Sequence, residues 1–283
     1  MGKIDILFRA INDVAHLQAS SLNKKNIKKI KKYFRKVFFK TYFLKFLTSD
    51  TENFKEFKVS FYNYKDFYFL FKDIFARQEY YFYSSNSKPL IIDCGANIGL
   101  ATIYFKWLYP DSEIHAFEPD LDTFKKLKSN VEMNNYKDVY LYNAAVSDFN
   151  GKLDFYIDKS RPGSLVMSTI YDRLPKDKIE VESISLSDFI ENKLNNRKID
   201  LLKMDIEGAE HHVLNKLIEK QQLNQFNEII LEYHHNIGND DSKLGKLLIE
   251  FEKSGFKYQI EAENYNLYQK NHFQDLLIYF YSK

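Results

Sequence analysis

Cysteine is nearly absent from this chain, and long apolar runs are absent altogether. The single cysteine, Cys94, excludes disulfide bonds within the chain and metal sites built from several thiolates. No stretch approaches the ~20 consecutive apolar residues that span a bilayer, and the opening "MGKIDILFRAINDV" lacks the apolar centre of a secretion signal. The sequence therefore predicts a soluble protein of the reducing cytoplasm.

The chain also lacks a strong excess of either charge. Its 41 Lys and Arg against 39 Asp and Glu leave a formal net charge of +2, so the protein as a whole is not expected to bind nucleic acid or another polyanion. Hydrophobic residues make up 45% of the 283 positions, as is typical of a globular protein. The length fits one large domain, or one domain with a sizeable extension.

A polar segment, "SSNSKPL" (84–90), divides the chain into a predicted N-terminal extension (1–85) and a main domain (86–283). Between Lys24 and Lys45 the extension has ten Lys or Arg and no acid, and the spacing of its apolar residues predicts a basic amphipathic helix. The apolar residues of this helix are Ile27, Ile30, Phe34, Val37, Phe38 and Phe39. We expect the helix to pack this face on the core, which is the common case; the alternative is docking on a membrane surface or a partner.

The aromatic stretch "VSFYNYKDFYFLF" (59–71) is predicted to form strands or a hairpin. After residue 88, strands are predicted at 89–94, 113–117, 139–146, 199–205, 227–234, 256–260 and 276–281. Helices are predicted up to about residue 109 and over 121–133, and the segments 151–158 and 179–186 alternate as an antiparallel pair. Strands that alternate with helices indicate an α/β fold with a doubly wound sheet.

The loop "DCGANIG" (93–99), which follows the first of these strands, has the features of a ligand site. Ligands of open α/β sheets bind at the carboxyl ends of the strands, and Gly95 and Gly99 permit a tight turn and a close approach of the backbone. The spacing is not GxGxxG, so a dinucleotide site fits poorly. Glu118 follows the second strand, where a carboxylate can accept both hydroxyls of a ribose; an acid in such a place is also a common helix cap.

The motifs "IIDCGANIGL", "IHAFEP", "IDLLKMDIEGAEHHVL" and "IILEYHH" together resemble the FkbM family of S-adenosylmethionine-dependent O-methyltransferases. The likeness covers about residues 75–260. It implies a class I methyltransferase (Rossmann-like) sheet of seven mostly parallel strands, with the last strand antiparallel and an inserted β-hairpin. It also implies S-adenosylmethionine as the cofactor.

By position, the resemblance assigns the methionine part of the cofactor to Asp93, Gly95, Ala96, Asn97 and Gly99. It assigns the ribose hydroxyls to Glu118, flanked by Phe117 and Pro119, and the adenine to the segment from Asn143 to Ala145. Tyr80, in the stretch before the glycine loop, would close over the cofactor.

Methylation of a hydroxyl needs a base, a metal ion, or both, because an alcohol is a poor nucleophile near neutral pH. Asp205, Glu232 and His234 end the strands expected beside the glycine-loop strand, and they suit a hard or borderline divalent ion such as Mg²⁺ or Mn²⁺. We predict that these three form a metal and base cluster, with His234 as the proton acceptor if it is not a ligand. Lys203, Glu207 and Glu210 would orient the substrate or support the cluster. The two glutamates have an alternative role as helix-start acids.

The other histidines receive no catalytic role. His211, His212 and His235 are expected at the surface or behind the cluster, and His115, within a strand, is expected in the core.

The sequence lacks the motifs of two classes of nucleobase methyltransferase. The chain has no Pro-Pro pair, which amino methylation of adenine in nucleic acid typically uses, and no Pro-Cys nucleophile for cytosine. A sugar hydroxyl is expected, on a nucleotide-activated sugar or a glycan precursor for a surface polysaccharide. The irregular segment 160–178 would form a substrate loop, where Arg161, Lys176 and Lys178 either meet phosphates or are merely solvated.

Three other functions remain open. The family resemblance leaves room for a polyketide-type natural product as the acceptor. A non-catalytic S-adenosylmethionine-binding protein would keep the fold without the chemistry, although the intact glycine loop, Glu118, Asp205 and Glu232 count against it. An NAD-dependent oxidoreductase is disfavoured by the missing GxGxxG.

Overall fold

The computed structural model describes residues 17, 22–44, 49–158, 177–236, 244–262 and 274–282. Its central sheet has seven strands: β3 (Leu90–Cys94), β4 (Glu113–Phe117), β5 (Val139–Tyr142), β9 (Ile199–Met204), β10 (Phe226–His235), β11 (Phe256–Ala262) and β12 (Gln274–Ser282). They lie in the order β11-β12-β10-β9-β3-β4-β5. β12 runs antiparallel to both of its neighbours, and the ladders from β10 to β5 are parallel. The predicted mostly parallel sheet with an antiparallel last strand is confirmed.

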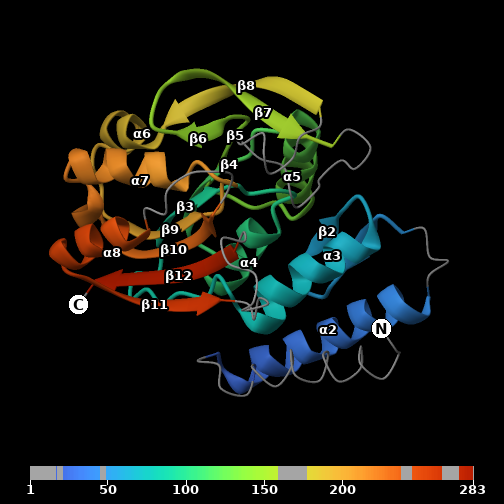
Figure 1. Ribbon diagram of the computed structural model, residues 1–283. Coiled ribbons are helices and arrows are strands. Elements are labelled where there is room, and N and C mark those ends of the chain that lie inside the picture. The colour runs from blue at the N-terminus through green and yellow to red at the C-terminus, as the bar shows by residue number, and fades with distance from the viewer. Residues whose placement is uncertain are drawn as a thin grey trace, which may run out of the picture.

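Helices cover both faces of this sheet (Figure 1). α4 (Leu100–Leu108) and α5 (Leu121–Met133) pack on one face, and α6 (Leu186–Asn192), α7 (Glu210–Glu219) and α8 (Leu244–Lys253) pack on the other. A short turn, η3 (Leu223–Gln225), precedes β10. Side chains of β3 alternate between the two cores: Ile91 joins the first, whereas Leu90 and Ile92 join the second. The sheet is therefore doubly wound, as predicted.

A second, three-stranded sheet is inserted after β5. It consists of β6 (Ala145–Ser147), β7 (Gly151–Ile157) and β8 (Asp177–Ser185) in the order β6-β8-β7, and β7 and β8 form the predicted antiparallel pair. The prediction of one strand over 139–146 is wrong, because the chain leaves the main sheet at Asn143. The Asn143 amide donates to the backbone oxygens of Glu118 and Pro119, and such a side-chain bond competes with a continuing strand.

The extension is mainly helical. It contains α2 (Lys24–Phe43), β1 (Thr51–Asn53), β2 (Lys58–Ser60), α3 (Tyr64–Phe71) and the π-helical turn η2 (Lys72–Arg77). The prediction of strands over 59–71 is wrong beyond β2. Asn63 caps α3 by accepting from the backbone N–H of Asp66, and Phe67 and Phe71 then fall on one buried helical face. Aromatic residues favour strands only weakly, so the cap and the helical spacing decide this segment.

The predicted basic helix forms and packs on α3, with Ile30, Phe34 and Val37 buried (Figure 1). The assignment of Phe39 to its packed face is wrong, because that side chain is 52% exposed. None of the described helices combines the length and the apolar character needed to cross a bilayer.

The extension and the sheet share one hydrophobic core. Phe75 of η2 contacts the rings of Phe71 in α3 and Tyr104 in α4, at centroid distances of 4.8 Å and 5.0 Å. All three rings are buried, in a cluster that also includes Phe34 of α2 and Ile91 of β3. The domain boundary near residue 85 therefore remains a prediction from the sequence, and we expect the two parts to unfold together.

Phe75→Ala tests this shared core. Loss of a buried ring that bridges both parts should lower the free energy of unfolding by about 3–5 kcal/mol and keep a single transition, measured by urea denaturation. Phe149→Ala, at a ring that is 46% exposed, should change it by no more than about 0.5 kcal/mol. Two separate transitions, with only one of them shifted by Phe75→Ala, would show that the extension folds independently.

Candidate active site

Three neighbouring strands bring the predicted site residues to one edge of the sheet. β9 lies between β3 and β10 and runs parallel to both, so their carboxyl ends meet. The glycine loop follows β3, Asp205 follows β9, and Glu232 and His234 lie near the end of β10. The adjacency expected from the sequence is confirmed.

The glycine loop closes tightly over these strand ends. Gly95 has a φ of 77°, and a Cβ atom at this position would lie 1.8 Å from the backbone oxygen of Asp205. The N–H groups of Gly95 and Ala96 both donate to the backbone oxygen of Phe117, which ties the loop to the end of β4. Only glycine fits at position 95, so the loop and the segment after β9 come into direct backbone contact.

Glu118 connects the glycine loop to the turn after β4. Its carboxylate accepts hydrogen bonds from the backbone N–H groups of Asn97 and Asp120, both at 2.9 Å. The side chain is only 4% exposed, and this burial raises the pKa of Glu118 to about 8. The carboxyl group is thus held rigidly at the wall of a cavity.

One cavity joins the glycine loop to the end of β10. Gly95, Ala96, Asn97, Glu118 and Ala145 line it, as the cofactor assignment requires. Its other lining residues include Tyr80, Phe117, Pro119, Ala144, Val146, Lys203, Asp205, Ile206, Glu207 and Glu232. Besides Glu118, five acids line the cavity, and these are Asp73, Glu79, Asp205, Glu207 and Glu232.

Three residues assigned to the cofactor do not line this cavity. Asp93 is fully buried beneath the loop, where it accepts from the hydroxyl of Thr102 at 2.8 Å. Gly99 packs against Leu127, and Asn143 holds the backbone after β4. These residues support the cavity wall without lining it, so direct contact with the cofactor is not supported for them.

Lys203 is the buried cation at the centre of the site. Its ammonium donates to the backbone oxygen of Gly95 at 2.8 Å and lies 3.4 Å from Asp205 and 3.6 Å from Asp93. It also lies 5.1 Å from the centre of the Tyr80 ring. Burial lowers the pKa of Lys203, but the charges of Asp205 and Asp93 outweigh it, so the pKa is raised and the group stays charged.

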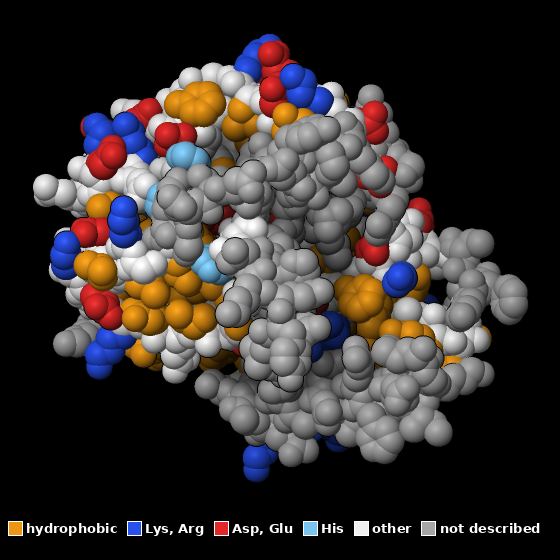
Figure 2. Space-filling model, in the orientation of Figure 1, with side chains coloured by type: hydrophobic (Ala, Val, Ile, Leu, Met, Phe, Trp, Pro, Cys, Tyr) orange, Lys and Arg blue, Asp and Glu red, His pale blue; other side chains and the backbone are white. Residues whose placement is uncertain are grey.

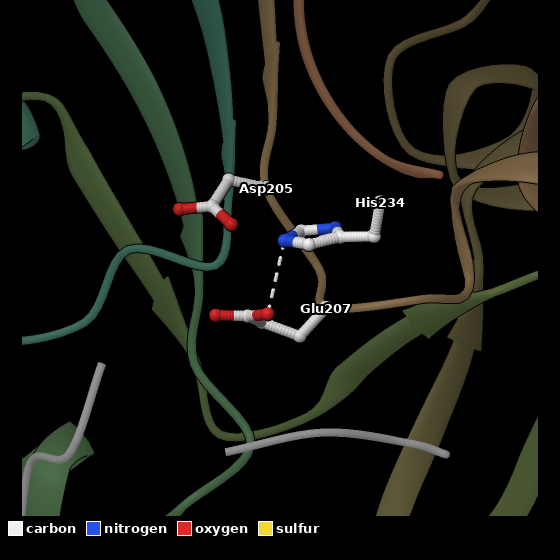
Figure 3. A group of neighbouring side chains, drawn as sticks. All are labelled: Asp205, Glu207 and His234. Atoms are coloured by element: carbon white, nitrogen blue, oxygen red, sulfur yellow. Dashed lines mark ion pairs between the residues drawn. The ribbon is translucent and has the colours of Figure 1, made fainter. Parts of the chain in front are cut away.

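His234 is clamped between two carboxylates. Its Nδ1 lies 2.7 Å from Glu210, and its Nε2 lies 3.0 Å from Glu207 and 3.6 Å from Asp275. Figure 3 shows the ring and the Glu207 carboxylate facing each other, with Asp205 beside them. Burial lowers the pKa of His234, but the charge of Glu210 and the hydrogen bonds that the ring donates to Glu207 and Glu210 raise it well above its ordinary value. A protonated ring held on both sides is a poor proton acceptor, contrary to the role expected from the sequence.

Glu207 and Glu210 thus have a structural role beyond placing negative charge at the start of a helix. Glu207 has a φ of 57°, a left-handed conformation that side-chain-bearing residues seldom adopt, and its carboxylate faces the ring of His234. Glu210 also accepts from the backbone N–H of Gly208 at 2.9 Å.

Sequence analysis missed Asp275. It lies opposite His234 in the ladder between β10 and β12. An acid does open the last predicted strand, but its place depends on an antiparallel register that the local sequence does not contain.

Glu232 faces the cavity from β10. Its side chain is partly buried, and desolvation together with the charge of Asp205 raises the pKa of Glu232 well above its ordinary value. This is the environment in which a carboxyl group can exchange a proton near neutral pH.

The remaining histidines agree with their predicted roles. His115 is buried and hydrogen-bonds to Glu113 and Tyr142, both at 3.0 Å. His212 is exposed, and neither it nor His211 or His235 lines the cavity.

The predicted substrate loop is only partly described. Lys178 pairs with Asp154, and Lys152 with Glu180, across β7 and β8, where Figure 2 shows blue and red side chains side by side at the top of the view. Lys178 is therefore a solvated surface charge. Arg161 and Lys176 lie outside the described residues.

His234→Gln tests the clamped imidazolium. A raised pKa stabilises the fold fully below about pH 6.5, where an unfolded histidine is also protonated, and this contribution is lost as the pH rises through the folded-state pKa. The variant should lose about 3–5 kcal/mol of unfolding free energy at pH 6, because the buried carboxylate of Glu210 and the partly buried one of Glu207 lose their partner, and less at alkaline pH. His212→Gln should have little effect at either pH. An NMR titration that places the pKa of His234 near 6.5 would contradict the clamp.

Comparison with known proteins agrees with this geometry. Residues 93–258 match the Methyltransferase FkbM domain, a span that runs from the glycine loop through β9 and β10. The chain is 28% identical over 219 residues to Methyltransferase 1 of Beauveria bassiana, covering 70% of this chain and 84% of that relative.

Two further relatives have names that state an O-methyl transfer. The 31-O-demethyl-FK506 methyltransferase FkbM of Streptomyces tacrolimicus is 25% identical over 224 residues, which cover 69% of this chain and 84% of the relative. The 2-O-methyltransferase NoeI of Sinorhizobium fredii is 30% identical over 142 residues, which cover 44% of this chain and 56% of the relative. The domain match spans more than half of the chain, so the protein belongs to the FkbM family and is an S-adenosylmethionine-dependent methyltransferase directed to oxygen.

Proposed function

We propose that the protein transfers a methyl group from S-adenosylmethionine to a hydroxyl of a sugar. One observation carries the proposal: a single cavity joins the glycine loop and Glu118 at one end to Asp205, Glu207 and Glu232 at the other. A methyl donor and a hydroxyl acceptor can therefore meet within one enclosure, which is the main requirement of an in-line transfer.

The donor end suits S-adenosylmethionine. Glu118 would accept the ribose hydroxyls, and the backbone of Gly95 and Ala96 would lie along the methionine part. Phe117 and Val146 offer apolar walls to a flat base. The cofactor supplies an activated methyl group when bound, so the chain's own task is to orient the acceptor and to remove its proton.

The acceptor end suits a polyol. Sugar hydroxyls donate hydrogen bonds, and the carboxyl groups of Asp205, Glu207 and Glu232 can receive them. The relative NoeI is named a 2-O-methyltransferase, which supports an oxygen as the methyl acceptor. A nucleotide-activated sugar or a glycan precursor for a surface polysaccharide remains our preferred form of the acceptor.

Glu232 is the proton acceptor that the geometry supports best. It faces the cavity and its raised pKa suits a base near neutral pH, whereas His234 is held as a cation by Glu207 and Glu210. Lys203 is a positioning residue, because its ammonium holds Asp205 and the glycine loop.

The metal hypothesis fits less well. Asp205, Glu207 and His234 each offer a ligand atom within 4.8 Å of the others, and so do Glu232, His234 and Asp275. A metal-binding imidazole must be neutral, however, and both groups depend on His234. We therefore assign no step to a metal ion.

Two alternatives differ in the acceptor or in the chemistry. A polyketide-type natural product is the alternative acceptor, in line with the name of the FK506-methylating relative. A non-catalytic protein that only binds S-adenosylmethionine is the alternative from another class, and it predicts no methyl transfer to any acceptor.

A labelled-methyl transfer screen tests the function. Nucleotide sugars, monosaccharides, glycolipids and a hydroxylated polyketide are offered with labelled S-adenosylmethionine, and we expect label on a sugar hydroxyl, with activity that survives EDTA. Label on the polyketide alone would show that the acceptor is a polyketide-type product and not a sugar. No transfer to any acceptor would support the non-catalytic alternative.

Glu232→Gln then tests the base on the acceptor found. Loss of the base should lower kcat by roughly 10²–10⁴-fold and remove the rise of kcat with pH, because only the ionised carboxylate accepts a proton. Glu228→Gln, four residues earlier in β10 and away from the cavity, is the matched control. An activity that EDTA abolishes and Mg²⁺ restores would favour the metal cluster instead.

A further inference from the structure

The outer face of α2 carries an ordered stripe of side chains. The exposed residues Lys25, Lys28, Lys32, Arg35, Phe39 and Phe43 follow one another at intervals of three or four. At 100° per residue they fall within an arc of about 80° on the helix. The buried residues Ile30, Phe34 and Val37 lie on the opposite side, so the stripe is the face turned away from the core.

Within the part of the chain that the structure describes, the four cations of the stripe pair with no acid. Other lysines of α2 pair with acids of the extension: Lys29 with Glu56, and both Lys36 and Lys40 with Glu52. Among the described residues, no ion pair involves a cation of the stripe, and α2 itself contains no acid. Figure 1 shows α2 at the edge of the molecule, with α3 between it and the sheet. The positive field of the stripe therefore points outward.

The stripe ends in an exposed aromatic pair. Phe39 and Phe43 are 52% and 53% exposed, and their rings stack at a centroid distance of 5.3 Å. Neither ring belongs to the hydrophobic core. The apolar face of α2 is buried in the core, so only this outer stripe can meet a surface. Cations that attract anionic lipids, together with exposed aromatic rings that can enter the interface, are the two contributions that bind a protein to such a membrane.

We propose that this stripe docks the protein on an anionic phospholipid bilayer. The cations would meet the headgroups, and the two rings would enter the boundary between headgroups and acyl chains. A nucleic-acid duplex would use the cations alone and would leave the aromatic pair unexplained. The bases of a single strand could stack on exposed rings, but Phe39 and Phe43 stack on each other, and the RNA outcome named below tests that case. The proposal rests on α2 and is independent of the acceptor.

Vesicle flotation of the full chain tests the proposal. The protein should float with vesicles of phosphatidylcholine and phosphatidylserine, but not with phosphatidylcholine alone. One basic residue near such a surface contributes about a fivefold factor, converted from ~1 kcal/mol. A variant with Lys28→Glu, Lys32→Glu and Arg35→Glu should therefore bind at least about 100-fold more weakly.

Matched variants distinguish the effect of the stripe on vesicle binding from the effect of net charge. Lys137→Glu, Lys193→Glu and Lys220→Glu together change the net charge equally at exposed positions elsewhere, and this control should bind like the original chain. Phe39→Ser with Phe43→Ser should weaken binding with every cation kept, and Phe39→Trp should give a blue-shifted emission that brominated lipids quench. Circular dichroism should show the original helix content in each.

Several results would overturn the proposal. The first is the absence of flotation with anionic vesicles. The second is a loss of vesicle binding in the Lys137, Lys193 and Lys220 control that equals the loss in the stripe variant. The third is vesicle binding that Phe39→Ser with Phe43→Ser leaves unchanged. Capture of RNA with no binding to anionic vesicles would assign the stripe to nucleic acid instead.

Discussion

The buried ammonium of Lys203 is the interaction on which the site depends. It projects from the middle strand of the sheet to the point where the glycine loop, Asp93 and Asp205 meet. Burying a charge costs several kcal/mol unless partners surround it, and here two carboxylates and the backbone oxygens of Cys94 and Gly95 do so. Because Gly95 leaves no room for a side chain against Asp205, the strand ends lock together around this cation.

Charge compensation then differs between the two ends of the cavity. Lys203 balances the carboxylates under the glycine loop, and His234 balances Glu207 and Glu210 behind the acceptor end. Glu118 and Glu232 are left facing the cavity, and burial raises the pKa of each. The first sits at the donor end, where it would bind a ribose, and the second sits at the acceptor end, where it would take up a proton. The fold thus supplies two carboxyl groups of similar chemistry with separate tasks.

Sequence patterns predicted the elements that local signals define. The range 113–117 became β4, and 121–133 became α5, because apolar runs there end at polar residues and Asp120 caps the helix. The segment 59–71 was mispredicted because its aromatic content hid a capped helix. At the site, the glycine loop and the acids at the strand ends were recognisable as motifs. The clamp on His234 was not, because Glu210 and Glu207 lie 24 and 27 residues earlier along the chain, Asp275 lies on β12, and only the tertiary fold brings them together.

The most direct measurement is a calorimetric titration of S-adenosylhomocysteine into the original chain and two variants. Glu118→Gln keeps the size of the side chain but replaces a carboxyl oxygen with an amide nitrogen that cannot accept a hydrogen bond from the ribose, so the affinity should fall by roughly 10- to 100-fold, as expected when a buried hydrogen-bonding group loses its partner. Glu132→Gln, exposed on α5, should bind like the original chain. Absence of binding by the original chain, or equal affinities for Glu118→Gln and Glu132→Gln, would contradict the assignment of this cavity to the cofactor.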